Sequence, residues 1–261
     1  MEGLTRHDGL EVVSGSAWPG LRYFCTTRRG GVSAGPWSAF NLGRHVGDRD
    51  VDVEHNRQRL ARTLPGPPLW LQQVHGVAVC DADRDFTGLP ARVPQADAAV
   101  TTRAHRVLAV LTADCLPVVL GSVDGAVLGL AHAGWRGLLD GVLEATLAAL
   151  QQRHPAGARA AWRAWIGPGI GPLCFEVGEE VRAAFMQADA RDAAGFVPGE
   201  RSGKWRGNLP ALARARLHRA GVGHIEASLL CTHTEEDWFF SYRRSGVTGR
   251  QATLAWRSPA L

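Results

Sequence analysis

The sequence has no apolar run long enough to cross a membrane. Every hydrophobic stretch falls well short of the ~18–20 residues that span a bilayer. The opening segment MEGLTRHDGLEVVSG also lacks the basic and apolar parts of an export signal. We therefore expect a cytoplasmic protein with no membrane partner.

Lysine is almost absent, because Lys204 is the only one and arginine supplies the other basic residues. The net charge is +4, yet the arginines are scattered along the chain. No basic tract is interleaved with aromatic residues, and no helix-turn-helix, zinc-finger or RNP signature occurs. These absences predict no nucleic-acid partner, while the excess of arginine suits small anions such as phosphate.

Paired cysteines and paired histidines are missing too. The five cysteines are widely spaced and form no CxxC pair, which favours reduced thiols: Cys25, Cys80, Cys115, Cys174 and Cys231. No His-x-His pair occurs, and the only methionines are Met1 and Met186. A multicopper oxidase needs several copper centres, and a blue-copper site often adds an axial methionine. The sequence therefore argues against laccase chemistry.

Many short apolar runs are present instead, bounded by Gly, Pro or Asp as strands usually are. Helical spacing or helix-start signals mark four segments, which are 137–152, 176–187, 209–220 and 50–63. Asp50 is the expected N-cap of the last of these. Regular alternation of strands and helices is absent, and no linker divides the chain. We predict a single domain over residues 1–261, of the α+β class, with sheets covered by helices.

Three candidate metal ligands stand at the ends of apolar runs. His75 closes WLQQVHG, Cys115 lies in LTADCLPVVL, and His132 lies in GLAHAG. Two imidazoles and one thiolate can hold a tetrahedral zinc ion and leave its fourth position open, as catalytic sites do. Their wide separation along the chain argues against a structural zinc finger.

Each of these residues also has an ordinary structural explanation. A cysteine in an apolar strand is most often a packed thiol, and a histidine beside it is often a hydrogen-bonded core residue. The charged neighbours Asp114 and Arg136 favour a functional site, since burying either one without a partner is costly. Composition alone leaves both interpretations open.

The motifs carry a resemblance that runs in order from about residue 23 to residue 257. The chain resembles the polyphenol oxidase or laccase-domain family, now described mainly as purine nucleoside phosphorylases with adenosine deaminase side activity. The combination of TADC with AHAGWRG is specific. The matching segments are TTRRGGVS, FNLGRHVGD, HNRQRL, LQQVHG, ADAAVT, VLTADCLPVVL, AHAGWRG, IGPGIGPLCFEVGEEV and CTHTEEDWFFSYRRSGVTGRQATLAW.

The resemblance implies a single domain with α/β/β/α layers. It implies that His75, Cys115 and His132 bind Zn²⁺, with copper as a substitute in vitro. It also implies substrate-side roles for Asn41, His45 and Arg57, although an N-L-G turn can equally reflect local backbone geometry. Purine nucleosides and phosphate are the implied partners: adenosine, inosine, guanosine or methylthioadenosine would yield a base and a pentose 1-phosphate.

Phosphorolysis needs a group that holds the phosphate dianion, and the planar guanidinium of arginine matches two of its oxygens. Arg57 and Arg136 are the candidates, with a structural ion pair as the alternative for either. Asp114, next to Cys115, is a candidate to orient a ligand or shuttle a proton. Neighbouring side chains of a strand point to opposite faces, however, so it could equally face away from the metal.

The chain departs from the family at two places. Asn208-Leu209 stands where an Asp-Leu pair usually opens a helix, and Leu173-Cys174 stands where two cysteines are often adjacent. Two further functions stay open: an amide hydrolase that edits peptidoglycan precursors, with Cys115 as nucleophile, and a non-catalytic nucleoside-binding protein. The preferred nucleoside and the oligomeric state are left undetermined.

Overall fold

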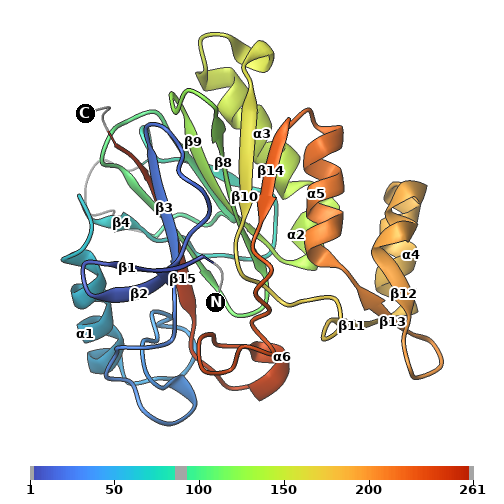
Figure 1. Cartoon of the computed structure of the whole chain (residues 1–261), viewed down its shortest axis with the longest axis horizontal. Helices are drawn as coiled ribbons and strands as arrows, with labels where there is room; N and C mark the ends of the chain where they lie inside the picture. Colours follow the sequence, from blue (N-terminus) through green and yellow to red (C-terminus); the bar gives the residue numbers. More distant parts are fainter. Residues whose placement is uncertain (1–2, 86–92, 259–261) are drawn as a thin grey trace.

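Two six-stranded sheets form the centre of the molecule (Figure 1). The computed structural model describes residues 3–85 and 93–258. The first sheet has the strand order β1 (Leu4–His7), β2 (Leu10–Val13), β3 (Leu21–Thr26), β15 (Gln251–Arg257), β7 (Val107–Thr112) and β4 (Pro68–Leu69). The second sheet has the order β14 (His224–Ala227), β10 (Trp162–Ile166), β8 (Leu116–Ser122), β9 (Leu128–Ala133), β6 (Ala98–Thr101) and β5 (Val79–Asp81).

The two sheets pack face to face, and strand β7 shows how the sequence achieves this. Its alternate residues Leu108 and Val110 enter the core between the sheets, where they meet Val119 and Leu130 of the second sheet. The intervening residues of β7 enter a separate core on the other face, together with Leu60. A strand that is apolar at nearly every position is therefore buried on both faces.

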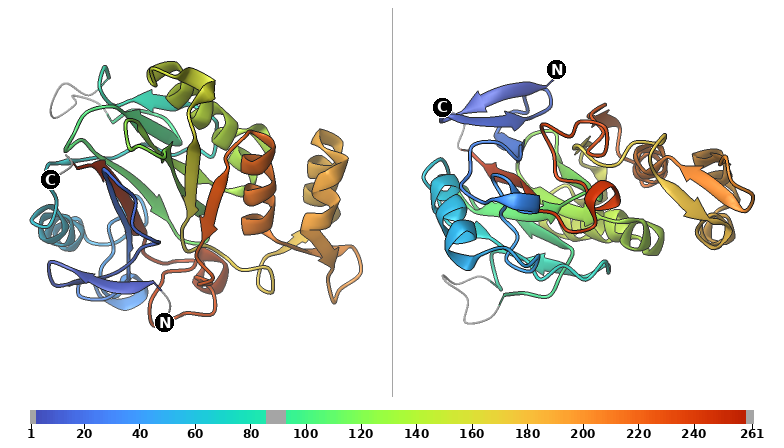
Figure 2. Two further views of the ribbon diagram at one scale, coloured as in Figure 1. Left: turned by 45° about the horizontal axis from the view of Figure 1, so that its top comes forward. Right: turned by 90° about the horizontal axis from the view of Figure 1, so that it is seen from below.

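Helices cover the outer face of each sheet (Figure 2). Helix α1 (Asp50–Ala61) lies on the first sheet, and α2 (Trp135–Asp140), α3 (Val142–Arg153) and α5 (Leu209–Arg219) lie on the second. A smaller unit projects to one side with α4 (Glu179–Ala188) and the sheet of β11 (Glu176–Gly178), β13 (Lys204–Gly207) and β12 (Phe196–Pro198). The short elements are α6 (Tyr242–Ser245), η1 (Gly35–Trp37), η2 (Gly157–Arg159) and η3 (Ala190–Gly195). The expected α+β class and α/β/β/α layers are confirmed.

The expected helices all exist, with corrections at their ends. The segment 137–152 is not one helix, because Gly141 adopts a φ of 99° and separates α2 from α3. The segment 176–187 begins as strand β11. Asp50 is the first residue of α1 rather than its N-cap, which is Arg49. Asn208 does cap α5, since its side chain accepts the N–H of Ala211.

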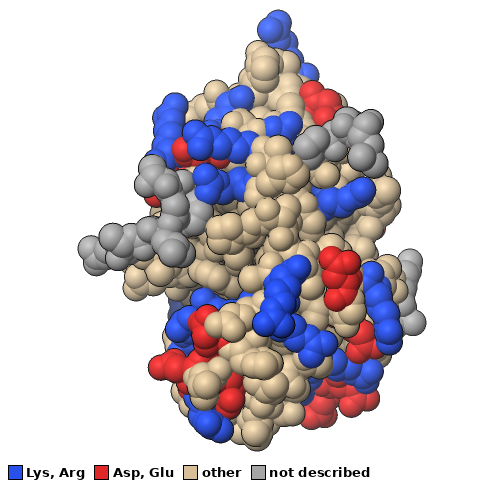
Figure 3. Space-filling model, turned by 90° about the vertical axis from the view of Figure 1, so that its left-hand side faces the viewer, with Lys and Arg blue, Asp and Glu red and all other residues tan. Residues whose placement is uncertain are grey.

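The apolar run LWLQQVHGVAVC (69–80) predicts one strand, but only its first residue belongs to β4 and only its last two belong to β5, with a loop between them. The run WFFSYRR (238–244) also has the pattern that predicts a strand, but that prediction is wrong because its second half forms helix α6. Both segments run past the same end of the sheets, where side chains of loops are exposed to a shared cavity. No helix in residues 3–85 and 93–258 is long and apolar enough to cross a bilayer. On the face drawn in Figure 3, basic and acidic side chains are interspersed.

Candidate metal centre and its cavity

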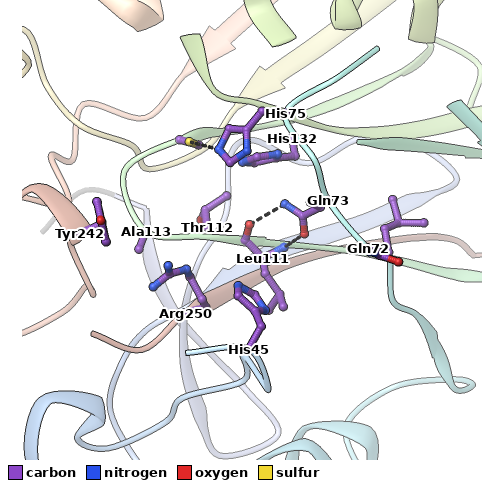
Figure 4. Close-up of a pocket in the computed structure, with 12 residues that line it drawn as sticks. His45, Gln72, Gln73, His75, Leu111, Thr112, Ala113, His132, Tyr242 and Arg250 are labelled. Carbon is purple, nitrogen blue, oxygen red and sulfur yellow. Dashed lines mark hydrogen bonds between the residues drawn. The ribbon is translucent and has the colours of Figure 1, made fainter. Parts of the chain in front are cut away.

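The structure brings His75, Cys115 and His132 together. One ligand atom of each lies within 4.8 Å of the others, and the sulfur of Cys115 lies 3.8 Å from Nε2 of His75. The two imidazole rings stand edge to face with centroids 4.8 Å apart (Figure 4). This is the only such group of three in the part of the chain that the structure describes. We call these three residues the metal triad.

Each member of the triad comes from a different local structure. His132 lies on β9 at the same parity as Leu128 and Leu130, and so faces the space between the sheets. Cys115 directly precedes β8. His75 lies in the loop between β4 and β5 with a φ of 62°, an uncommon conformation for a residue with a side chain.

Asp97 holds two of these three residues in place. Its Oδ1 accepts the backbone N–H of His75 at 2.9 Å and lies 2.9 Å from Nδ1 of His132. Its Oδ2 accepts the N–H groups of Val74 at 3.1 Å and Gly76 at 2.7 Å. The carboxylate therefore fixes the strained turn at His75. It also places a proton on Nδ1 of His132, which leaves Nε2 free as a ligand.

Sequence reasoning missed Asp97. Its segment ADAAVT contributes to the family resemblance, but a single acid ahead of an apolar strand has no ligand signature. The useful signal is its burial, because its side chain is 0% exposed and a buried carboxylate needs partners. The pKa of Asp97 is lowered: burial would raise it, but the hydrogen bonds from His132 and Gly76 outweigh that effect.

Glycine at position 134 gives the triad its space. A Cβ atom there would lie 2.7 Å from Cδ2 of His75 and 3.0 Å from the sulfur of Cys115. No side chain fits at those distances, so the AHAG segment needs its final glycine for close approach rather than for an unusual φ.

The electrostatics of the triad favour a thiolate. Burial alone would raise the pKa of Cys115, but the neighbouring His132 and His75 outweigh it and lower that pKa to about 6. Burial would likewise lower the pKa of His132, whereas Cys115 and Asp97 raise it to about 9. Two imidazoles and a thiolate fit Zn²⁺, whose sites use nitrogen and sulfur ligands. The donor set therefore matches the metal that the resemblance implies.

A cavity of about 530 Å³ opens beside the triad. Its walls include Leu71 from the loop after β4, Leu111 from β7, Tyr242 from α6, and Arg250 immediately before β15 (Figure 4). Gln73 also lines it, but the amide of Gln73 is fixed by two hydrogen bonds of 2.8 Å to the backbone of Leu111. No residue pattern in the sequence marks Tyr242, Arg250 or Gln73 as a site residue.

The predicted substrate residues divide into two kinds. His45 lines the cavity, and its pKa is lowered by burial and by the charges of Arg250 and Arg57. Asn41 is fully buried, and its side chain bonds Asp48, the backbone of Gly43 and the backbone N–H of Arg250 at 2.9 Å. Asn41 therefore supports the loop of His45 and the position of Arg250, and does not line the cavity.

Arg57 stacks on Trp70, with its guanidinium carbon 4.1 Å from the ring centre, and donates to the carbonyl of Leu42 at 2.9 Å. Burial and nearby Arg44 lower the pKa of Arg57 to about 10. Its charge acts on His45, but Arg57 is not among the residues that line the cavity. Arg136 is exposed in the first turn of α2 and also does not line the cavity.

Asp114 faces away from the triad. Its φ is 93°, its Oδ1 accepts the hydroxyl of Thr232 at 2.7 Å, and its Oδ2 accepts the backbone N–H of Arg243 at 2.7 Å. Its own carbonyl accepts the N–H of Ile170 at 2.8 Å. Asp114 thus connects two loops and helix α6 to the residue that precedes Cys115.

Comparisons with known proteins agree with this site. A family model described as multi-copper polyphenol oxidoreductase laccase matches residues 22–258. The chain is 45% identical to purine nucleoside phosphorylase YfiH of Escherichia coli over 244 residues, covering 92% of this chain and 96% of that protein. It is 48% identical to a purine nucleoside phosphorylase of Xylella fastidiosa over 248 residues, covering 91% and 93%.

Solved structures match as well. A crystal structure of a Neisseria meningitidis protein superposes with a TM-score of 0.86 at 40% identity, covering 95% of this chain and 98% of that one. The YfiH protein of Bacillus licheniformis superposes with a TM-score of 0.86 at 29% identity, covering 97% and 98%. This chain therefore belongs to the laccase-like polyphenol oxidase family, whose curated relatives are named purine nucleoside phosphorylases.

Proposed function

We propose that the chain is a zinc-dependent purine nucleoside phosphorylase with adenosine deaminase side activity. The carrying observation is the metal triad, fixed by Asp97, at the wall of a cavity that also contains Arg250. The proposed substrates are adenosine, inosine, guanosine and methylthioadenosine, together with phosphate. The names of the curated relatives support this class of reaction.

The cavity suits a nucleoside in size and chemistry. At about 530 Å³ it lies within the ~300–1,000 Å³ range of small-molecule sites. Leu71 and Leu111 offer apolar walls for a base, and the ring of Tyr242 offers a surface for stacking. Arg250 and His45 lie across the cavity from the triad (Figure 4) and are our candidates for binding phosphate.

In the proposed reaction, a phosphate oxygen forms a bond to C1′ while the bond from C1′ to the purine nitrogen breaks. The base leaves with the electron pair and takes up a proton, and the products are the free base and the pentose 1-phosphate. Arg250 holds the dianion toward C1′, and the lowered pKa of His45 keeps its imidazole neutral near pH 7, able to donate one hydrogen bond.

Zinc bound by His75, Cys115 and His132 would supply a Lewis acid and a water of lowered pKa, which is the chemistry that deamination of adenosine at C6 requires. Asp97 would keep Nε2 of His132 directed at the metal. Its hydrogen bonds to the loop of Val74, His75 and Gly76 would hold the second imidazole at a constant distance.

A product assay tests the proposal. Purified protein with quantified zinc is given adenosine, with and without phosphate. We expect adenine and ribose 1-phosphate only with phosphate, inosine without it, and loss of both products in His75→Ala and Cys115→Ala. Cys25→Ser, in the core between the sheets, is the matched control. No turnover of any of the four nucleosides by zinc-loaded protein would overturn the proposal.

A hydrolase with Cys115 as nucleophile is the second candidate, supported by its lowered pKa and by His75 at 3.8 Å. Its substrate would be the amide of a peptidoglycan precursor. Alkylation separates the two: a nucleophilic Cys115 would react with iodoacetamide in the active protein, whereas a zinc-bound thiolate would be protected. Retained nucleoside binding without any turnover would instead favour a non-catalytic binding protein.

We further propose that residues 1–261 act as one domain in the cytoplasm. The cavity draws residues from both sheets and from helix α6, which supports a single functional unit. All five cysteines are free thiols, as a reducing compartment favours.

A further inference from the structure

Cys174 and Cys231 form a thiol pair outside the metal triad. Cys174 lies in the turn before β11, and Cys231 lies in the loop after β14. The two side chains lie close enough for the Cys231 sulfur to affect the Cys174 thiol. Both are partly exposed, whereas Cys25 and Cys80 are buried. The family resemblance gives this pair no role.

Backbone amides surround the sulfur of Cys231. The N–H of Gly171 donates to it at 3.1 Å, and the backbone amides of Thr234 and His233 lie near enough to act on it. Amide N–H groups beside a sulfur favour its thiolate form. Burial would raise the pKa of Cys231, but these hydrogen bonds outweigh it and lower the pKa.

The neighbouring thiol has the opposite character. Burial and the charge of Cys231 raise the pKa of Cys174, which therefore stays protonated. The other two thiols outside the metal triad do not compete, since burial raises the pKa of both Cys25 and Cys80 to about 12. One reactive thiolate with an adjacent thiol is the arrangement of a redox pair.

We propose that Cys231 is a peroxide-reactive thiolate and that Cys174 resolves it, so that the two residues form a reversible disulfide. The Cys231 sulfur attacks one oxygen of hydrogen peroxide, the O–O bond breaks and hydroxide leaves, giving a sulfenic acid. The Cys174 sulfur then attacks the Cys231 sulfur, the S–O bond breaks and water leaves with the thiol proton. The two sulfurs lose two electrons, and the peroxide is reduced to the level of water.

This pair lies close to the metal centre through Asp114. Thr232, next to Cys231, donates its hydroxyl to Asp114 at 2.7 Å and its N–H to Gly169 at 2.9 Å. Ile170, on the loop of Cys174, donates to the carbonyl of Asp114 at 2.8 Å. Drawing the sulfurs to about 2.0 Å therefore pulls on both anchors of the residue that precedes Cys115. Oxidation is expected to lower turnover at least about twofold, an effect that rests on the proposed function.

Peptide mapping tests the disulfide without any nucleoside. Zinc-loaded protein is treated with hydrogen peroxide, its free thiols are blocked with N-ethylmaleimide, and trypsin then releases residues 164–182 and 220–243. Each of these peptides contains one cysteine, Cys174 and Cys231 respectively. We expect the two peptides to be linked, and to separate on treatment with dithiothreitol. Two alkylated, unlinked peptides would overturn the proposal.

Two further measurements test the role of each thiol, and the first needs no variant. In untreated wild-type protein, Cys231 should react with N-ethylmaleimide at least about tenfold faster than Cys25 or Cys80. In Cys174→Ser, peroxide should leave a sulfenic acid on Cys231 that dimedone traps, and turnover should no longer depend on dithiothreitol. Equal alkylation rates would refute the reactive thiolate. A linked pair with unchanged turnover would refute only the effect on the metal centre.

Discussion

Replacing Asp97 with asparagine preserves the size of the side chain and turns one of its two acceptors into a donor. Each carboxylate oxygen of Asp97 lies within hydrogen-bonding distance of two N–H donors: His75 and His132 at Oδ1, and Val74 and Gly76 at Oδ2. Asparagine has an NH2 donor in place of one carboxylate oxygen. In either orientation of the amide, this NH2 group would face two N–H groups that need an acceptor. At least two hydrogen bonds are therefore lost unless His132 changes its tautomer, which would place a proton on the nitrogen that should bind the metal.

The expected magnitude follows from these contacts. Hydrogen bonds to a charged group contribute about 1.5–3 kcal/mol each, so losing two lowers the free energy of unfolding by about 3–6 kcal/mol. Loss of a carboxylate behind a ligand histidine typically weakens metal binding by about 10–100-fold. We expect Asp97→Asn to show both effects, measured by urea unfolding and by competition with a zinc-binding fluorophore.

The matched control is Asp83→Asn. Asp83 is also nearly buried, with 6% of its side chain exposed, and bonds the backbone of Thr102 at 2.8 Å and Arg153 at 2.6 Å, but it contacts no member of the triad. This control should lose stability and keep its zinc affinity. A folded Asp97→Asn protein that binds zinc within about twofold of wild type would refute the reasoning. An equal loss of zinc affinity in both variants would show that the effect comes from general destabilisation.

Three further predictions follow from contacts of the same kind. Gly134→Ala should lower zinc affinity at least about tenfold in the same competition assay, because its Cβ would lie 2.7 Å from His75. Burial would raise the pKa of Asp83, but the hydrogen bonds from Thr101 and Thr102 outweigh it and lower that pKa. The contribution of Asp83 to stability is therefore full above about pH 4–5 and is lost as the pH falls through the folded-state pKa. Urea unfolding should therefore show a gap between wild type and Asp83→Asn at pH 7 that narrows at pH 3; a constant gap would contradict the shift. Arg250→Ala should raise the KM for phosphate at least about tenfold, whereas Arg182→Ala, which removes an arginine stacked on Trp205 4.0 Å away, should leave it within about twofold.

The layered fold could be predicted because its signals are local and repeated. Short apolar runs between turn residues indicate strands, and β7 and β8 are apolar at nearly every position because each is buried on both faces. The end of a helix depends on finer detail. Gly141 lies inside a continuous helical pattern, and only its left-handed φ shows that the chain changes direction there.

The metal triad could be proposed from sequence because a thiol and two imidazoles are unusual at the ends of apolar runs. The residue that holds the triad in place could not be predicted in the same way. Asp97 acts through backbone N–H groups of a loop that is distant in sequence, and backbone donors leave no trace in the residue types. Arg250 was missed for a related reason, since an arginine before a strand is ordinary until Asn41 fixes its backbone at the cavity wall.

The word laccase in the family's description does not match the set of metal-ligand atoms in this chain. A multicopper oxidase needs several copper centres, while the described residues provide one group of three ligands at His75, Cys115 and His132. The third imidazole that lines the cavity, His45, lies on the opposite wall beside Arg250 (Figure 4), and its pKa is lowered by burial and by the charges of Arg250 and Arg57. The positive charge of Arg250, across the cavity from a single metal site, suits an anionic substrate such as phosphate better than it suits a second copper ion. Copper loading should therefore saturate at about one ion per chain, and a stoichiometry of three or more by mass spectrometry would contradict this argument.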